Sequence, residues 1–173
     1  MLISHHELVR RAEKWLRNSC RCKVVLTECS GRLEIPDAMG WKDSMSIDSI
    51  LVECKASRSD FFADLRKEHR RDPNCPENPG DLRYYLTPPR LLKSEEIPTG
   101  WGLIEAHEGR IITIVAAPKR PFNAMRRAKE SQYFFSELLK IQFAMSGREL
   151  MPTKSGRRIM DYIRKRPDLS GQA

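Results

Sequence analysis

The chain has 173 residues, and its 31 lysines and arginines against 23 aspartates and glutamates give a formal net charge of +8. This length fits one domain with a substantial core, and the basic excess favours a polyanionic partner, nucleic acid first and an anionic membrane surface second. No apolar stretch approaches the roughly 20 residues of a membrane helix and the N-terminus lacks a signal-peptide pattern, so we expect a soluble cytoplasmic protein.

The chain contains five cysteines, an odd number, which predicts free thiols of a reducing compartment rather than a disulfide framework. Cys20, Cys22 and Cys29 are close enough in sequence to raise the question of a zinc or iron–sulfur site, with Cys75 as a fourth ligand. The C-x-x-C pair that is typical of such sites is missing, which argues against a structural metal.

The first predicted element is an amphipathic helix over residues 5–18. Ser4 followed by Glu7 is typical of a capping box, in which the serine side chain accepts a hydrogen bond from a backbone N–H of the first turn. Apolar residues then recur at helical spacing, and the basic residues fall mostly between them. One face of this helix should therefore pack on the core.

Three extended segments follow this helix. Residues 23–27 are rich in β-branched side chains, residues 33–38 form a second extended segment, and residues 47–56 form a third. If the second and third segments pair, Asp37 lies beside Glu53.

A second helix is predicted over residues 58–70, with Ser57 as its cap and Phe61, Phe62 and Leu65 as its packing stripe. Its other side chains are mostly basic: Arg58, Arg66, Lys67, His69, Arg70 and Arg71. We expect this surface to hold a phosphate backbone, and a merely solvated face is the alternative.

Residues 72–81 contain three prolines and a glycine, which predicts a surface loop. Strands are expected over 82–87, 100–106 and 110–116, the last two forming a hairpin. The helix over 58–70 is then the crossover that parallel strands need. The expected result is a mixed sheet of five or six strands.

From Asn123 the pattern changes to a helix whose apolar residues are expected to contact the sheet: Met125, Ala128, Phe135, Leu138, Leu139 and Phe143. A second short helix is expected around residues 157–166. We therefore divide the chain into a core over residues 1–122 and a basic helical extension over residues 123–173 that packs on it.

Residues able to carry chemistry lie in the second and third extended segments. Side chains alternate along a strand, so Glu53 and Lys55 share one face while Ile50, Val52 and Cys54 point the other way. Carboxylates from neighbouring strands, here Asp37 and Glu53, can hold Mg²⁺, and a lysine beside them can orient or deprotonate a metal-bound water. This combination predicts phosphodiester hydrolysis. The alternative is an exposed polar face of an edge strand beside an ordinary turn.

Pro36-Asp37, Glu53-x-Lys55 and the order of the surrounding elements resemble the PD-(D/E)xK nuclease superfamily, which has the restriction-endonuclease-like fold. The resemblance implies an α/β core with a mixed central β-sheet flanked by helices, here with a C-terminal helical extension. It implies that Asp37 and Glu53 ligate Mg²⁺ or Mn²⁺, that the backbone carbonyl of Cys54 adds a ligand, and that Lys55 positions the attacking water.

The resemblance covers roughly residues 4–117 and extends to small uncharacterised phage and bacterial members that are associated with DNA repair or phage replication. Many relatives add a glutamate from an early helix or strand. Glu28 is the first candidate for that role and Glu7 the second, whereas alternation turns Glu34 to the opposite face.

Arg83 and Tyr84 follow the proline-rich loop, where a basic and an aromatic side chain can contact a phosphate and stack on a base. The alternative is that the aromatic residues belong to the core and the arginine to the surface.

The sequence has no H-x-x-x-H pair, P-loop, G-x-S-x-G elbow or Rossmann fingerprint, which disfavours the corresponding enzyme classes. We expect a Mg²⁺-dependent deoxyribonuclease, structure-selective or weakly sequence-specific, acting on DNA or secondarily on RNA, with a homodimer as one arrangement. The alternatives are a DNA-binding module without turnover and a basic interaction protein such as a phage anti-defence factor.

Overall fold

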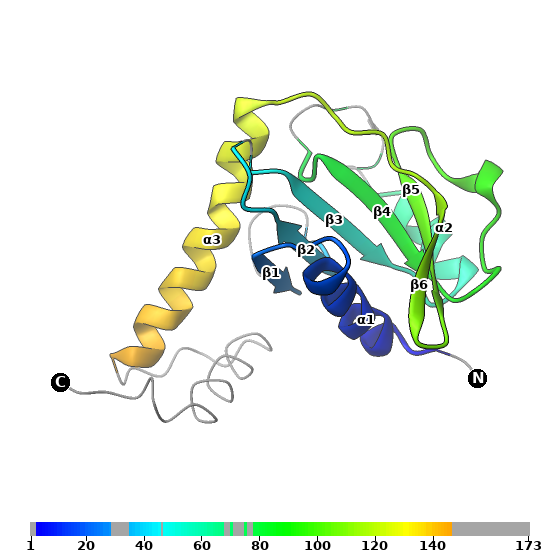
Figure 1. Cartoon of the computed structure of the whole chain (residues 1–173), viewed down its shortest axis with the longest axis horizontal. Coiled ribbons are helices and arrows are strands. Elements are labelled where there is room, and N and C mark those ends of the chain that lie inside the picture. Colours follow the sequence, from blue (N-terminus) through cyan, green and yellow to red (C-terminus); the bar gives the residue numbers. More distant parts are fainter. Residues whose placement is uncertain are drawn as a thin grey trace.

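The computed structural model describes residues 3–28, 35–45, 47–67, 70, 75 and 78–146. It has an α/β fold in which one six-stranded sheet runs in the order β1-β2-β3-β4-β5-β6 (Figure 1). The strands are β1 Val24–Thr27, β2 Ala38–Trp41, β3 Ser49–Cys54, β4 Leu82–Thr87, β5 Gly102–His107 and β6 Arg110–Val115. The helices are α1 His5–Asn18, α2 Arg58–Leu65, α3 Ala124–Met145 and a short 3₁₀ turn, η2 Ser94–Glu96.

The sheet is mixed, as expected. β3 and β5 each pair with β4 in parallel, and the three other neighbouring pairs are antiparallel. The segment that contains α2 connects β3 to the parallel strand β4, which confirms the predicted crossover. The hairpin of β5 and β6 is also confirmed.

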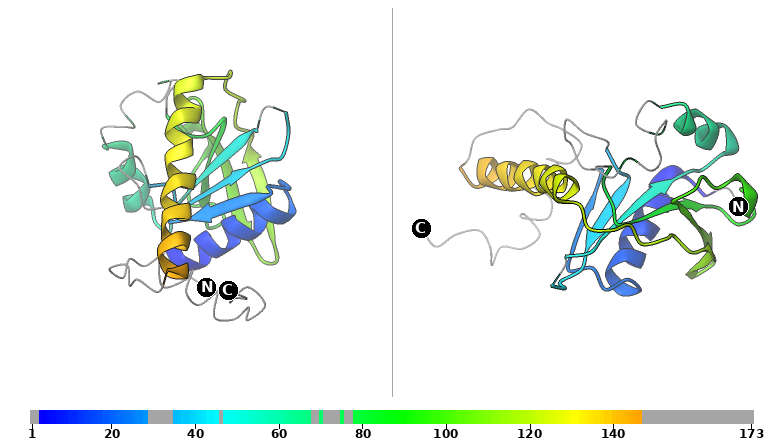
Figure 2. Two further views of the ribbon diagram at one scale, coloured as in Figure 1. Left: turned by 90° about the vertical axis from the view of Figure 1, so that its left-hand side faces the viewer. Right: turned by 90° about the horizontal axis from the view of Figure 1, so that it is seen from above.

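Helices cover both faces of the sheet (Figure 2). α1 packs through Leu8, Ala12 and Leu16 on the face that carries Ile50 and Val52. The opposite face is covered by α2 and by α3, which lies beside β1 and β2 (Figure 1). The Ser4 side chain accepts the predicted hydrogen bond from the Glu7 N–H, at 3.2 Å.

The second strand starts later than predicted. β2 begins at Ala38, not at residue 33, and it includes Gly40, which pairs with Ile50. A side chain at position 40 would come within 2.7 Å of the Cys22 sulfur, so glycine allows the segment after α1 to cross this strand closely. Residues 33 and 34 lie outside the described part of the chain.

The helix predicted over residues 58–70 ends at Leu65. Arg66 and Lys67 donate to carbonyls three residues earlier, at 3.3 and 3.0 Å, which is the tighter geometry common at helix ends. Phe61 is buried as predicted, but Phe62 is 40% exposed and does not belong to the packing stripe.

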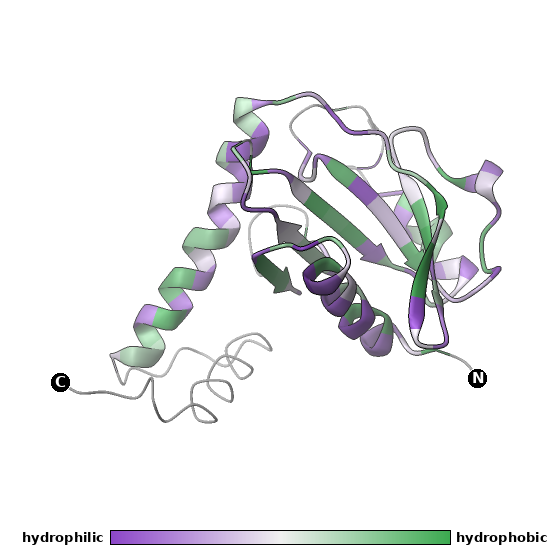
Figure 3. Ribbon diagram, viewed as in Figure 1, coloured by the Kyte–Doolittle hydropathy of each residue, from purple (hydrophilic) through white to green (hydrophobic). Residues whose placement is uncertain are grey.

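The long C-terminal helix does not bury the apolar residues predicted for it. Five of the six are exposed, among them Phe135 at 64% and Leu138 at 63%, and Phe143 is half-buried. Hydrophobic positions are visible along its C-terminal half (Figure 3). The buried residues of α3 are instead Arg126, Glu130, Tyr133 and Lys140.

A buried polar network explains this orientation of α3. The Glu130 carboxylate accepts hydrogen bonds from the Ser49 hydroxyl at 2.9 Å and from the Gly80 N–H at 3.0 Å. Its other oxygen accepts from the Trp41 indole at 3.2 Å and from Arg127 at 2.7 Å. Because a buried carboxylate is costly unless it is paired, these contacts determine which side of the helix faces the sheet.

Asp81 completes this network from the loop before β4. It accepts a hydrogen bond from the Ser49 N–H at 2.9 Å, pairs with Arg126 at 2.9 Å and also pairs with Arg127. Tyr133 then packs with Met39 and Trp41 of β2. The extension therefore packs on the core through the N-terminal half of α3. Arg126, Arg127 and Glu130 make the polar contacts. Tyr133 and Phe134 make the aromatic ones, and the Phe134 and Trp41 ring centres lie 4.4 Å apart.

None of the helices in the described part of the chain has the length and apolar character of a membrane-spanning segment.

Candidate functional site

Asp37 and Glu53 meet where β2 begins and β3 ends. Ala38 pairs with Val52 in the antiparallel register, so Asp37 and Glu53 come opposite each other one step further on. The Asp37 carboxylate accepts a hydrogen bond from the Cys54 N–H at 2.7 Å. The aspartate thus lies against the backbone that joins Glu53 to Lys55.

Glu53 and Lys55 point to the same side of the sheet, as alternation predicts. The Lys55 ammonium lies 3.3 Å from the Glu53 carboxylate, and Cys54 packs on the opposite face with α1. Both charged residues are only 3% exposed, and β3 lies between two other strands. The alternative of an exposed edge strand is therefore wrong. Asp37, Glu53 and Lys55 are called the carboxylate–lysine site below.

Asp64 of α2 is the residue of this region that sequence reasoning missed. It is 1% exposed and lies 3.3 Å from the Lys55 ammonium, 2.8 Å from that of Lys67 and 2.9 Å from the Arg70 guanidinium. The Tyr85 hydroxyl also donates to it, at 3.3 Å. Burial acts to raise the pKa of Asp64, but the charges around it, Arg70 first, hold that pKa well below its usual range.

Lys55 stays protonated in this environment. Burial alone would lower the pKa of its ammonium, but the carboxylates of Glu53, Asp64 and Asp37 outweigh burial and raise the pKa. Lys55 can therefore orient a water or offset developing negative charge, and it is not a proton acceptor in this state.

Asp37, unlike Lys55, is shifted toward its neutral form. Burial raises the pKa of its carboxyl, against the Cys54 N–H and the nearby charges of His5 and Lys55. His5, from the first turn of α1, lies 3.3 Å from the second Asp37 oxygen and is a further residue that sequence reasoning missed. A cation beside Asp37 would stabilise the ionised carboxylate and so offset the cost of its burial.

The donor set at this edge fits Mg²⁺ better than a metal that needs a protein cage. Mg²⁺ is usually bound by one or two carboxylates and keeps waters and substrate phosphates as its other ligands. In the described part of the chain, no group of three or more histidines, cysteines, aspartates or glutamates is arranged to hold a metal ion. Asp37 and Glu53 would hold the ion, with Glu53 also paired to Lys55 and, at 3.1 Å, to Arg70.

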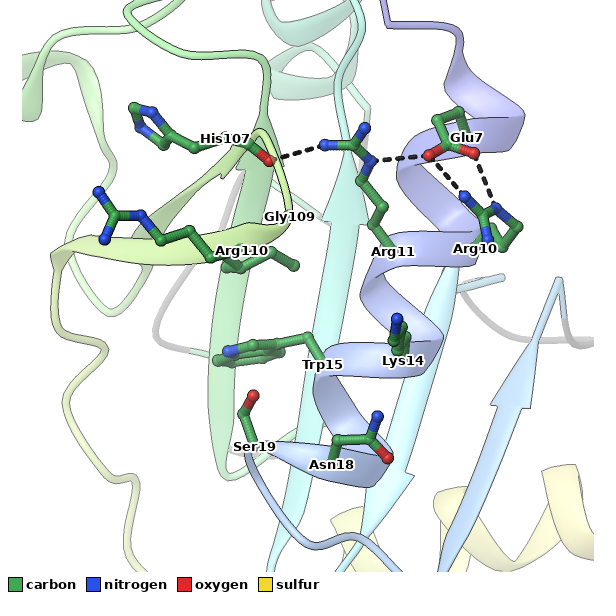
Figure 4. Close-up of a pocket in the computed structure, with 11 residues that line it drawn as sticks. Glu7, Arg10, Arg11, Lys14, Trp15, Asn18, Ser19, His107, Gly109 and Arg110 are labelled. Carbon is green, nitrogen blue, oxygen red and sulfur yellow. Dashed lines mark hydrogen bonds and ion pairs between the residues drawn. The ribbon is translucent and has the colours of Figure 1, made fainter.

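The two additional glutamates differ in position. Glu28 follows β1 in a left-handed conformation with φ of 49°, and its N–H donates to the Asp37 carbonyl at 3.0 Å. It therefore lies next to the carboxylate–lysine site, and its role there stays a prediction. Glu7 instead pairs with Arg10 at 2.8 Å and with Arg11 at 2.7 Å (Figure 4), so its carboxylate is committed to α1.

Three residues predicted to contact nucleic acid are buried. Arg70 is 7% exposed and Arg83 1% exposed, and their guanidinium groups lie 4.6 and 4.0 Å from the centre of the Trp101 ring. Tyr84 is 9% exposed and meets Trp15 edge to face. In this packing none of the three can reach a ligand. The alternative was right for the tyrosine, but the arginine is not on the surface.

The other residues predicted to contact nucleic acid lie on the surface or outside the described part of the chain. Arg58 is half-exposed and its guanidinium pairs with Glu96, with a further hydrogen bond to the Leu91 carbonyl at 3.0 Å. Lys67 is exposed and pairs with Asp64. Arg71 lies outside the described residues.

The four described cysteines, Cys20, Cys22, Cys54 and Cys75, are free thiols. Burial raises the pKa of Cys20 to about 12 and also raises that of Cys22 and Cys54. Cys29 lies outside the described residues.

No family model matches this chain, and no curated protein is significantly similar to it. The structure is similar to that of a protein of unknown function from Silicibacter pomeroyi, with a TM-score of 0.62 and 22% identity. The match covers 86% of this chain and 97% of that one. It supports the α/β fold and carries no information on activity.

Proposed function

We propose that this chain is a metal-dependent nuclease that hydrolyses phosphodiester bonds of DNA. The observation that carries the proposal is the convergence of Asp37, Glu53 and Lys55 at one end of β3, where the Asp37 carboxylate bonds to the peptide between the other two. Two carboxylates and a protonated lysine on adjacent strands match the chemistry that phosphodiester hydrolysis needs.

Each residue has a distinct role in this proposal. Asp37 and Glu53 bind Mg²⁺ or Mn²⁺, which would supply an activated water and offset charge on the phosphate. Lys55, kept charged by its neighbours, positions that water. Asp64 and Arg70 are positioning residues, because Asp64 pairs with Lys55, and Arg70 pairs with the carboxylates of Glu53 and Asp64. The excess of basic residues favours nucleic acid as the substrate.

One observation favours a second candidate, a DNA-binding module without turnover. The two Glu53 oxygens are already paired, one with Lys55 and the other with Arg70. A carboxylate held by two cations is also what a purely structural ion pair would look like. Cleavage assays separate the two candidates.

The test compares wild-type protein with Asp37→Asn and Lys55→Met on linear, circular single-stranded and branched DNA, with Mg²⁺, Mn²⁺ or EDTA. Asparagine is chosen because its carbonyl oxygen can still accept from the Cys54 N–H. The matched control is Asp48→Asn, which removes a carboxylate before the other end of β3, where it pairs with Lys119 at 2.9 Å. Products are followed on denaturing gels, and folding is checked by circular dichroism.

The nuclease proposal predicts metal-dependent cleavage by wild type and Asp48→Asn, and a loss of about 10²-fold or more in the other two variants. Cleavage that survives Asp37→Asn would place the activity elsewhere. DNA binding without cleavage, equal in all four proteins, would support the non-catalytic module.

A further inference from the structure

A basic cleft separates α1 from the hairpin of β5 and β6 (Figure 4). Its volume is about 320 Å³, which lies within the roughly 300–1,000 Å³ of small-molecule sites. Its main lining residues are Arg10, Arg11, Lys14, Trp15, His107 and Arg110. None of them belongs to the carboxylate–lysine site.

The charge of the cleft selects an anionic ligand. Hydrogen bonds from Arg10 and Arg11 lower the pKa of Glu7 to about 2, so this glutamate stays ionised and offsets one of the four cations. Lys14 and Arg110 are exposed, and neither pairs with a carboxylate within the described part of the chain. The cleft therefore keeps a net positive charge, and its two unpaired cations come from opposite walls, one from the helix and one from the hairpin (Figure 4).

The cleft also contains an aromatic surface. The Trp15 ring is half-buried between the helix and the hairpin, and its edge-to-face contact with Tyr84, at 5.6 Å and 79°, fixes its orientation. Trp41 and Trp101 are each 3% exposed, so Trp15 is the tryptophan that a ligand can reach. Asn18 and Ser19 add hydrogen-bonding groups beside it.

A ring held in place beside cations suits a ligand that is both flat and anionic. Nucleotides have this combination, and single-stranded nucleic acids are bound through aromatic stacking together with basic contacts to the backbone. The location agrees, because His5 contacts Asp37 and Trp15 lies ten residues further along the same helix, about 15 Å away.

We propose that the basic cleft binds one nucleotide of a single-stranded nucleic acid, with its base on Trp15 and its two flanking phosphates at Lys14 on one wall and at Arg110 on the other. The inference rests on the proposed nuclease function in one respect: if the chain cleaves DNA, the substrate must contain a single-stranded segment that occupies the cleft. That segment lies along α1 and leads to the carboxylate–lysine site.

The test is a fluorescence titration in EDTA, so that binding is measured without catalysis. The ligands are a short oligothymidylate, a duplex of the same length and thymidine monophosphate. The proteins are wild type, Trp15→Phe, the double variant Lys14→Gln/Arg110→Gln, and the control Lys23→Gln/Lys93→Gln, which removes two exposed lysines outside the cleft.

The oligothymidylate is expected to quench the emission of wild type and of the control. Trp15→Phe loses this quenching but keeps an aromatic ring in the core. The double variant binds about tenfold more weakly, and the dependence of its log affinity on log salt falls by about 0.7 per lost phosphate contact.

Quenching that persists in Trp15→Phe, or equal weakening in the double variant and the control, would overturn the assignment. If thymidine monophosphate bound as tightly as the oligothymidylate, the cleft would be a site for free nucleotides, and the assignment to a single-stranded nucleic acid would also be overturned. Cleft binding that persists while wild type cleaves no DNA would contradict the nuclease proposal and leave the cleft assignment standing.

Discussion

Replacing Glu130 by alanine tests whether the buried polar network holds α3 on the sheet. Glu130 is 1% exposed and accepts four hydrogen bonds, from Ser49, Gly80, Trp41 and Arg127. Alanine leaves these donors without their acceptor. Water can reach only part of the gap, because Arg127 is the one partially exposed member of this group.

The expected loss in the free energy of unfolding follows from the cost of removing one partner of a buried ion pair, about 3–5 kcal/mol. Each orphaned donor costs about 1–3 kcal/mol when considered alone, but the effects overlap and are not summed. For a protein of this size, a loss of about 4 kcal/mol lowers Tm by about 8–16 °C. Glu130→Gln keeps the volume and one acceptor oxygen, so its loss should be about half as large.

Urea denaturation followed by circular dichroism measures this change, with Gln132→Ala as the control on an exposed position of the same helix. The control is expected to stay within about 0.5 kcal/mol of wild type. A loss below about 1 kcal/mol in Glu130→Ala, with an unchanged denaturant slope, would refute the view that this carboxylate anchors the helix.

Three further predictions concern the core, the acidic cluster and the thiols. Gly102→Ala should lower the free energy of unfolding in urea by about 1–3 kcal/mol, because the added carbon would lie 2.5 Å from the Tyr84 ring and 2.6 Å from the Ala117 backbone nitrogen. A neutral result would mean that both the ring and this backbone segment can shift. Asp64 has a lowered pKa in the folded state, so its stabilisation is present above the unfolded pKa of about 3.9 and is lost as pH falls through the folded value. Stability of wild type should accordingly fall more steeply below about pH 5 than that of Asp64→Asn, and parallel curves from pH-dependent denaturation would contradict this assignment. Cys20, with a pKa near 12, should react with a disulfide reagent at neutral pH far more slowly in the native than in the unfolded protein, as mass mapping of the labelled thiols can show.

Short-range patterns in the sequence predict much of the fold. Alternation along β3 correctly separates Glu53 and Lys55 from Cys54, because the period of a strand is a local property of the backbone. The two serine caps are also confirmed, since each needs only a neighbour three residues away.

The partners of Lys55 were not predictable in the same way. Asp64 lies nine residues after Lys55 on a helix, where a polar residue normally faces water, and only the packing of α2 over β3 turns it inward. His5 meets Asp37 from a segment 32 positions earlier, so no local spacing connects the two. Sequence reasoning missed these residues because their contacts depend on the assembled sheet.

The C-terminal helix shows how an apolar stripe can mislead. Arg126, Glu130 and Tyr133 recur at helical spacing and form the face that is buried. Charged residues in that pattern predict a solvated face unless a partner is known. The partner is Asp81, which lies far away in sequence, and its charge decides which side of α3 turns inward.

The hydrogen bond between Asp37 and the Cys54 N–H gives the carboxylate–lysine site a built-in reporter. One oxygen of the Asp37 carboxylate accepts the hydrogen bond that a backbone carbonyl of a neighbouring strand would normally accept. The other oxygen faces His5. Any ion or substrate group that approaches Asp37 must redistribute electron density across that bond. The amide resonance of Cys54 should therefore shift when Mg²⁺ is added to ¹⁵N-labelled protein, without any probe attached near the site.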